Sequence, residues 1–213
     1  MELPKIIGAT PSRRYPKTSI VLFQGEVPRY GFIVEEGCLK VYAIDDDGNE
    51  KVVGIYSRGD VFPVDWLNGS SRSVMFYYET LEDSKLLPIQ KSDCENGDFA
   101  QYVQNFTSRE TTTALLRNLA LQQSNATSKI LYFFFYLAMR HGQEKGSGLF
   151  SLGLPLTHQF IADNLGLTRE TVAGEMSKLK KASVVMYRKK RYVVDKSLLI
   201  KTVGKEITNN FIT

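Results

Sequence analysis

The sequence contains few cysteines: Cys38 and Cys94 are the two among its 213 residues. An iron–sulfur cluster is typically held by four thiolates, so one copy of the chain cannot supply the ligands of such a cluster. In a reducing compartment two cysteines usually remain unpaired thiols, and we expect that state here. Redox sensing by either thiol is the alternative.

Histidine is equally scarce, with His141 and His158 as the two in the chain. A Ser–His–Asp or Cys–His catalytic set needs an imidazole close to its nucleophile. Both histidines fall in segments that we expect to be helical, and no P-loop or glycine-rich dinucleotide fingerprint accompanies them. We therefore do not expect an enzyme.

Long apolar runs are also missing. No stretch approaches the roughly 18 consecutive apolar residues that a membrane-spanning helix needs, so neither such a helix nor a membrane partner is expected. The first residues lack the apolar segment of a secretion signal, which makes the cytoplasm the expected location. The chain is nevertheless 43% hydrophobic, which is enough for a packed core.

The positive charge is unevenly distributed along the chain. Residues 155–213 carry 11 Lys or Arg and 5 Asp or Glu, a net charge of +6, within a total of +4. The preceding residues are therefore slightly acidic. A basic final third indicates contact with a polyanion, and a solvated basic face is the alternative.

The pattern between residues 15 and about 90 indicates β-structure. Short apolar runs, such as residues 19–23, 39–44 and 52–56, alternate with turn signals at residues 45–49 and 57–60. Short strands at this spacing predict a sandwich or barrel rather than alternating strands and helices.

The next segment, residues 98 to about 141, is predicted to be helical. It contains neither proline nor glycine up to Arg140 and is expected to break near Ser124, with Asn125 capping a second helix. The first helix has a broad apolar face, which either packs against the β-region or joins two copies of the chain. We predict a dimer interface made by Phe99, Val103, Phe106, Leu115, Leu116 and Leu119.

A glycine-rich segment at residues 142–153 marks a domain boundary. After it, Thr157 is a plausible N-cap of a helix, and Gly166 allows the chain to reverse within three or four residues. Thr168 then caps a second helix, whose inward positions include Val172 and Met176. Residues 187–194 (YRKKRYVV) follow as a β-hairpin with a basic tip.

A helix, a tight turn, a second helix and a basic hairpin suit DNA binding, because the second helix can place its N-terminal side chains against base edges in the major groove. Arg169 can pair with guanine and Glu170 can accept a hydrogen bond from cytosine, with help from Thr168 or Thr171. The alternative is a helical hairpin with solvated charges. The predicted phosphate contacts are Thr157, Thr168, Lys178, Lys180, Arg188, Lys189, Lys190 and Arg191.

These residues carry a family resemblance. Residues 157–185 (THQFIADNLGLTRETVAGEMSKLKKASVV) resemble the helix-turn-helix of the Crp/Fnr regulators. Upstream, residues 124–131 (SNATSKIL) are similar to the start of the helix that follows the family's dimer helix. The turns FQGE, VEEG, GNE and SRGD, between residues 23 and 60, resemble those of its β-roll.

The resemblance implies an α+β protein in three parts. Residues 1–97 would form a cyclic-nucleotide-binding-like antiparallel β-roll, a jelly-roll-like double-stranded β-helix. Residues 98–123 would form a dimerisation helix, and residues 124–213 a winged helix-turn-helix DNA-binding domain. A homodimer would then bind a two-fold operator in double-stranded DNA beside a promoter, with RNA polymerase as a further partner and an effector in the roll reorienting the DNA heads.

The expected effector site departs from the cyclic-AMP-binding members of the family. Pro63 and Val64 stand where those members have Gly-Glu, and Ala114 and Leu115 replace the polar pair that reads adenine. We therefore expect no tight binding of cyclic AMP and leave the effector unidentified. The candidate pocket residues are Phe62, Asp65, Trp66, Arg72, Ser73, Ala114 and Leu115.

Several of these pocket residues have alternative interpretations. The glutamate that would bind the ribose hydroxyls is absent, unless Asp65 substitutes for it. Arg72-Ser73 resembles the family's phosphate pair but comes two residues early, and the alternative is a surface pair. An apolar ring suggested by Phe62, Trp66, Phe76 and Leu115 either holds an apolar molecule or is filled core. No cofactor is expected. Because the histidines lie outside the β-region, a haem could be bound here only with Cys38 or Cys94 as its ligand.

The reading helix also departs from the family. Gly174 stands where members with this Arg-Glu-Thr-Val run carry a further guanine-reading arginine. The operator is therefore expected to be degenerate at that base pair, unless Gly174 instead serves a close approach to another surface, with Glu175 facing solvent. A ligand-responsive interaction module with little DNA specificity is the alternative function.

Overall fold

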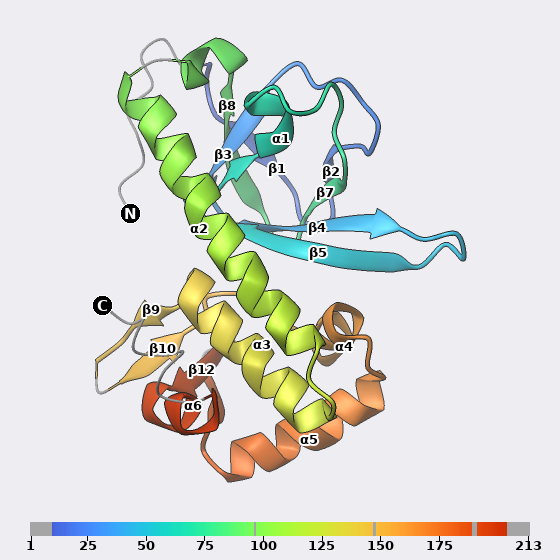
Figure 1. Cartoon of the computed structure of the whole chain (residues 1–213), viewed down its shortest axis with the longest axis vertical. Helices are drawn as coiled ribbons and strands as arrows, with labels where there is room; N and C mark the ends of the chain where they lie inside the picture. Colours follow the sequence, from blue (N-terminus) through green and yellow to red (C-terminus); the bar gives the residue numbers. More distant parts are fainter. Residues whose placement is uncertain (1–9, 96, 147, 189–190, 204–213) are drawn as a thin grey trace. The chain divides into compact units, whose positions relative to one another are not determined.

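The computed structural model describes residues 10–95, 97–146, 148–188 and 191–203 (Figure 1). Its contacts divide the chain into two compact units, Met1–Glu110 and Thr111–Thr213. The long helix α2, Gly97–Leu121, contributes to both units. None of the described helices is both long and apolar enough to span a membrane.

The N-terminal unit contains two antiparallel four-stranded sheets, as the β-roll prediction requires. In one sheet the strand order is β1-β8-β3-β6, and in the other it is β2-β7-β4-β5. The strands are β1 Arg13–Tyr15, β2 Ile20–Leu22, β3 Gly31–Glu36, β4 Cys38–Ile44, β5 Glu50–Ser57, β6 Val61–Phe62, β7 Tyr77–Thr80 and β8 Ser84–Ile89.

A core lies between these two sheets. Phe32 and Phe62 from the first sheet pack with Leu39 and Tyr78 from the second, and each is at most 4% exposed. The rings of Phe62 and Tyr78 stack with centroids 4.8 Å apart. Phe32 and Val34 of β3 and Leu39 and Val41 of β4 belong to this core, as expected when alternate side chains of a strand point to the same face.

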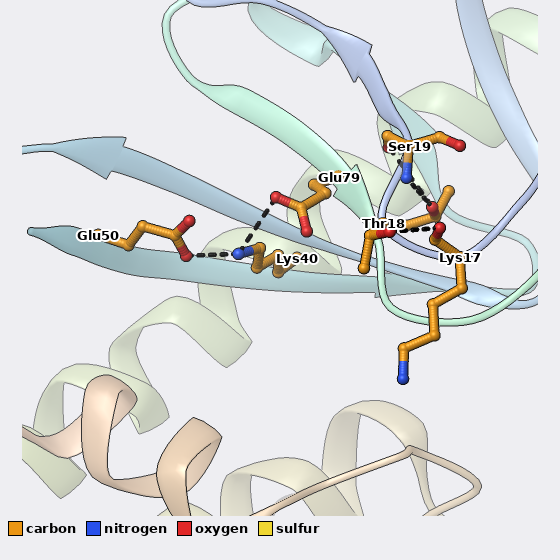
Figure 2. Close-up of polar contacts among 7 residues, drawn as sticks. Lys17, Thr18, Ser19, Lys40, Glu50 and Glu79 are labelled. Atoms are coloured by element: carbon orange, nitrogen blue, oxygen red, sulfur yellow. Dashed lines mark hydrogen bonds and ion pairs between the residues drawn. The ribbon is translucent and has the colours of Figure 1, made fainter.

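The outer face of the second sheet is held by charge pairs. Figure 2 shows the ammonium group of Lys40 between the carboxylates of Glu50 and Glu79, with the Glu79 oxygen 3.2 Å away. Lys40 and Glu79 are direct register partners on β4 and β7. Opposite charges on directly paired residues stabilise the strand register.

The start of α2 completes a second core of the N-terminal unit. Phe99, Val103 and Phe106 pack with Ile33 and Trp66 and are 6%, 7% and 1% exposed. This is the alternative packing of the apolar helix face, and it corrects the expectation that these three side chains lie in a dimer interface. A single chain already covers them.

Hydrogen bonds fix the same part of α2. The Tyr102 hydroxyl donates to the carbonyl oxygen of Gly59 at 2.6 Å, and the Arg109 guanidinium lies 3.3 Å from the carboxylate of buried Asp60. Two short helices complete the unit, α1 Val64–Leu67 and the 3-10 helix η1 Lys91–Cys94.

The C-terminal unit is built on α3, Ala126–His141, whose Asn125 cap accepts a hydrogen bond from the Ser128 amide at 2.8 Å. The predicted break and cap are therefore confirmed. The helix packs against α4, α5 and α6. The remaining elements are β9 Gln143–Glu144, β10 Leu149–Ser151, α4 His158–Leu165, α5 Arg169–Lys181, β11 Val185–Arg188, β12 Arg191–Asp195 and α6 Lys196–Val203, with the sheet order β11-β12-β10-β9.

Candidate DNA-binding site

Helix α4 begins where the sequence predicts. The Thr157 hydroxyl oxygen accepts a hydrogen bond from the Phe160 amide at 3.0 Å, which satisfies one of the unpaired amides of the first turn. Phe160, Ile161 and Leu165 are all buried. A threonine cap accepts through its oxygen and retains a hydroxyl proton for a phosphate.

The turn between α4 and α5 depends on Gly166. Its backbone is left-handed, with φ 63° and ψ 40°, a conformation that costs glycine little. Two residues later, the Thr168 hydroxyl oxygen accepts from the Thr171 amide at 3.1 Å and starts α5. Both predicted signals are confirmed, and together they fix the angle between the two helices.

Helix α5 has a buried and an exposed face. Val172, Met176 and Leu179 are at most 5% exposed and anchor the helix. Arg169 and Glu170 lie at its exposed N-terminal end. These two side chains are therefore accessible to solvent, and the buried residues on the opposite side anchor the helix within its unit.

The surroundings of α5 are electropositive. The pKa of His158 is lowered, first by burial and then by the positive charges of Lys180 and Arg169. The imidazole of His158 therefore lies near two cationic side chains. Arg169 begins α5 and Lys180 lies in its last turn, and cations along a helix attract a polyanion without selecting its sequence.

Glu175 does not face solvent, which contradicts that part of the alternative in which Gly174 serves a close approach. Its carboxylate accepts a hydrogen bond from the Thr127 hydroxyl at 2.5 Å and lies 2.6 Å from the Lys178 ammonium. The pKa of Glu175 is lowered, first by Lys178 and then by Thr127. The contact ties α5 to the first turn of α3, and it places the predicted phosphate ligand Lys178 in an ion pair.

The hairpin formed by β11 and β12 has the predicted position after α5. Arg188 is exposed and Arg191 is half-buried, whereas Lys189 and Lys190 lie outside the described residues. A hollow of about 520 Å³ beside them is lined by Lys145 and Leu149 as well as by the two arginines. The sequence reasoning missed Lys145, because its place in the glycine-rich segment gave no sign that β9 and β10 join this sheet.

The predicted effector residues do not come together at one site in the structure. Asp65 lies on a cavity of about 300 Å³ within the N-terminal unit. Phe62 belongs to the first core and Trp66 to the second, and neither lines that cavity. For these two residues the structure agrees with the filled-core alternative. Arg72 is exposed and Ser73 half-buried, and neither is among the described residues that line the cavity.

The sequence reasoning missed most of the cavity. Its other lining residues include Tyr56, Tyr78 and Glu110. Glu110 follows Phe106 by four residues in α2, so the helical period could have placed it on the face toward the roll. No local signal marks the two tyrosines, because their strands are brought together by the sheet.

The remaining candidates for the dimer interface differ in how exposed they are. Leu116 is 6% exposed and Leu119 is half-buried, whereas Leu115 is 66% exposed. Ala114 beside it is exposed as well. Leu115 belongs to a stripe along α2 with alternating three- and four-residue spacing, made of Gln101, Asn105, Ser108, Thr112, Leu115 and Leu119.

Comparison with known proteins agrees with this architecture. Residues 12–97 match the cyclic nucleotide-binding domain, and residues 128–201 match the Crp-like helix-turn-helix domain. The chain is 26% identical to the electron transport regulator A of Shewanella oneidensis over 76% of its own length and 66% of that protein. It is 26% identical to the transcriptional activator FnrL of Cereibacter sphaeroides over 91% of its own length and 81% of FnrL.

A solved structure shares the fold. FixK2 from Bradyrhizobium japonicum superposes with a TM-score of 0.73 at 22% identity, over 97% of this chain and 98% of that one. The β-roll, the long helix and the helix-turn-helix therefore occur in the same order in both proteins.

Proposed function

Because the chain belongs to the Crp/Fnr family of transcription regulators, we propose that it binds a two-fold operator as a homodimer, with α5 in the major groove. The observation that carries the proposal is the exposed start of α5, where Arg169 and Glu170 follow the Thr168 cap. A bidentate contact of either side chain with a base distinguishes that base by about 1–3 kcal/mol.

A regulatory ligand in the β-roll and contact with RNA polymerase are further parts of this proposal, taken from the family. The relatives named above are regulators, and no enzymatic activity is proposed. The experiment that tests the function is retention of genomic fragments by the purified protein, followed by sequencing at several salt concentrations. Salt-dependent enrichment of a palindromic motif supports the proposal, whereas the absence of DNA retention supports an interaction module.

The hairpin provides the first prediction. Replacing Arg188 by glutamine is expected to weaken binding to every duplex by the same factor, because a phosphate contact carries no sequence information. The slope of log affinity against log salt should become shallower by about one unit. Fluorescence titration of a selected and a scrambled duplex measures both effects.

The matched control for this titration is Arg14→Gln, which removes an exposed arginine from β1 and should leave both quantities unchanged. A loss confined to one base position would argue against the phosphate assignment of Arg188. An unchanged affinity would mean that the tip of the hairpin is solvated and makes no contact with DNA.

Gly174 provides the second prediction. A Cβ built there meets no atom of the described residues within 4 Å outside its own helical turn, so none of their surfaces requires a glycine. Because glycine in a helix interior costs about 0.5–1 kcal/mol relative to alanine, Gly174→Ala should raise the free energy of unfolding by that amount. Urea denaturation measures the change.

The same position tests the reading of DNA. Gly174→Arg is expected to add a guanine preference at a base pair that the natural protein leaves degenerate, as selection from random duplexes would show. If Gly174→Ala instead weakens binding to all duplexes, the glycine serves close approach to DNA, and the prediction of an unused reading position fails.

A further inference from the structure

The cavity in the N-terminal unit has the dimensions of a small-ligand site. Its volume is about 300 Å³, at the lower end of the range for ligand pockets in proteins, about 300–1,000 Å³. The lining comes from β4, β5 and β7, the residues just before β7, the short helix α1, and Glu110 of α2. A molecule bound there would touch both the roll and the helix that continues into the C-terminal unit.

The charge of the lining is negative. Among the described residues that line the cavity, Asp65 and Glu110 are acidic and none is Lys, Arg or His. Arg109 precedes Glu110, but its guanidinium lies beside Asp60. A phosphate or carboxylate in this cavity would face two carboxylates and no basic side chain among the described lining residues, and burial of an anion without a cationic partner is strongly unfavourable.

Asp65 has an unused acceptor. Its Oδ2 atom is buried and accepts no hydrogen bond from any described residue. The backbone around it is fixed, because the carbonyl oxygen of Asp65 accepts from the Ser70 hydroxyl at 3.0 Å and from the Ser71 amide at 2.9 Å. A buried carboxylate oxygen without a donor is unfavourable. A charged N–H donor would satisfy it best once the side chain turns toward the cavity, because the atom has almost no accessible surface as it lies.

The rest of the lining is aromatic and apolar. Tyr56, Phe76 and Tyr78 contribute rings, and Met75 and Val53 are 53% and 37% exposed. The pKa of Tyr78 is raised, first by burial and then by the negative charges of Asp65 and Glu110. The two carboxylates therefore act on the same aromatic wall, and a cation near the rings gains a further attraction from their faces.

From this combination we infer that the cavity binds a small organic cation, a protonated amine on an apolar or aromatic body, and that this cation is the regulator's effector. The amine donates to Asp65, and its apolar body packs among the rings and Met75. The inference about the effector rests on the proposed function, because only a DNA-binding regulator has an affinity for the cation to change.

Calorimetry on the full chain with phenethylammonium as the probe tests the inference. We expect it to bind at least tenfold more tightly than 2-phenylethanol, which has the same body and no charge. Phenylacetate and cyclic AMP, both anions, should give no measurable heat of binding. Equal binding of the amine and the alcohol, no binding of the amine to folded protein, or micromolar binding of cyclic AMP would overturn it.

The variant Asp65→Asn keeps the size of the side chain and removes its charge. We expect it to weaken phenethylammonium at least tenfold and to leave the binding of 2-phenylethanol unchanged. Asp46→Asn, at the exposed tip of the β4–β5 hairpin, is the matched control and should change neither. If Asp65→Asn does not fold, the comparison of the four probes on the natural protein still decides.

DNA titration separates the two proposals. Operator binding without any heat of amine binding means that the cation inference fails and the proposed function stands. Amine binding without DNA retention means that the proposed function fails and that the cavity still binds a cation. If the amine binds and operator affinity stays the same within twofold, the cavity is a cation site but the cation is not the effector.

Discussion

Replacing Glu170 by alanine is expected to erase the selection of one base pair in each half-site. The carboxylate is exposed at the start of α5, where it can accept a hydrogen bond from the amino group of cytosine. Each such contact is worth about 1–3 kcal/mol and occurs twice in a two-fold operator, so affinity for the selected operator should fall by about 2–6 kcal/mol. Selection from random duplexes and titration of the resulting operator measure the two effects.

Arg169→Ala should relax a different base pair, because the two side chains leave the helix in different directions. Arg188→Gln is the control, since it should reduce affinity while the selected motif stays the same. An unchanged motif after Glu170→Ala would mean that the reading residues have been wrongly assigned.

The second large effect is expected from Leu115→Asp. Leu115 is 66% exposed in the middle of the α2 stripe, where an apolar side chain has no cover within its own chain. A charge there should separate a homodimer into monomers and leave each DNA-binding unit to hold one half-site alone. Linked binding of two sites gains about 10²–10⁴ in affinity, so operator affinity should fall by about 100-fold or more.

Sedimentation velocity with and without operator measures the assembly state, and fluorescence titration measures the affinity. Val27→Asp is the control, because Val27 is an apolar side chain of the roll that is 76% exposed. If the Leu115→Asp variant stays dimeric, the interface does not lie on this face of α2. A natural protein that is monomeric at micromolar concentration, with and without DNA, would refute the homodimer itself.

The features that sequence predicts well here follow from local rules. Asn125, Thr157 and Thr168 each accept from an amide three residues later, and Gly166 adopts the left-handed conformation. Each of these interactions is completed within one helical turn. A single sequence therefore contains everything needed to predict them.

The features that sequence predicts poorly depend on distant partners. The apolar face at Phe99 and Phe106 is correctly predicted to be buried, but its periodicity does not say which surface covers it, and that surface is the roll. Glu175 follows its partner Thr127 by 48 residues. The cavity joins Tyr56 to Glu110 in the same way, so only the folded chain brings the two together.

The open space above Gly174 has a consequence for how this regulator could diverge. Every glycine codon becomes an arginine codon when its first base changes from G to C, so a single nucleotide substitution separates the two residues. The Cβ of the added side chain has open space among the described residues, and the substitution replaces a poor helix former by a good one. Duplicated genes could therefore acquire separate operators in one step, without first losing the stability of the protein.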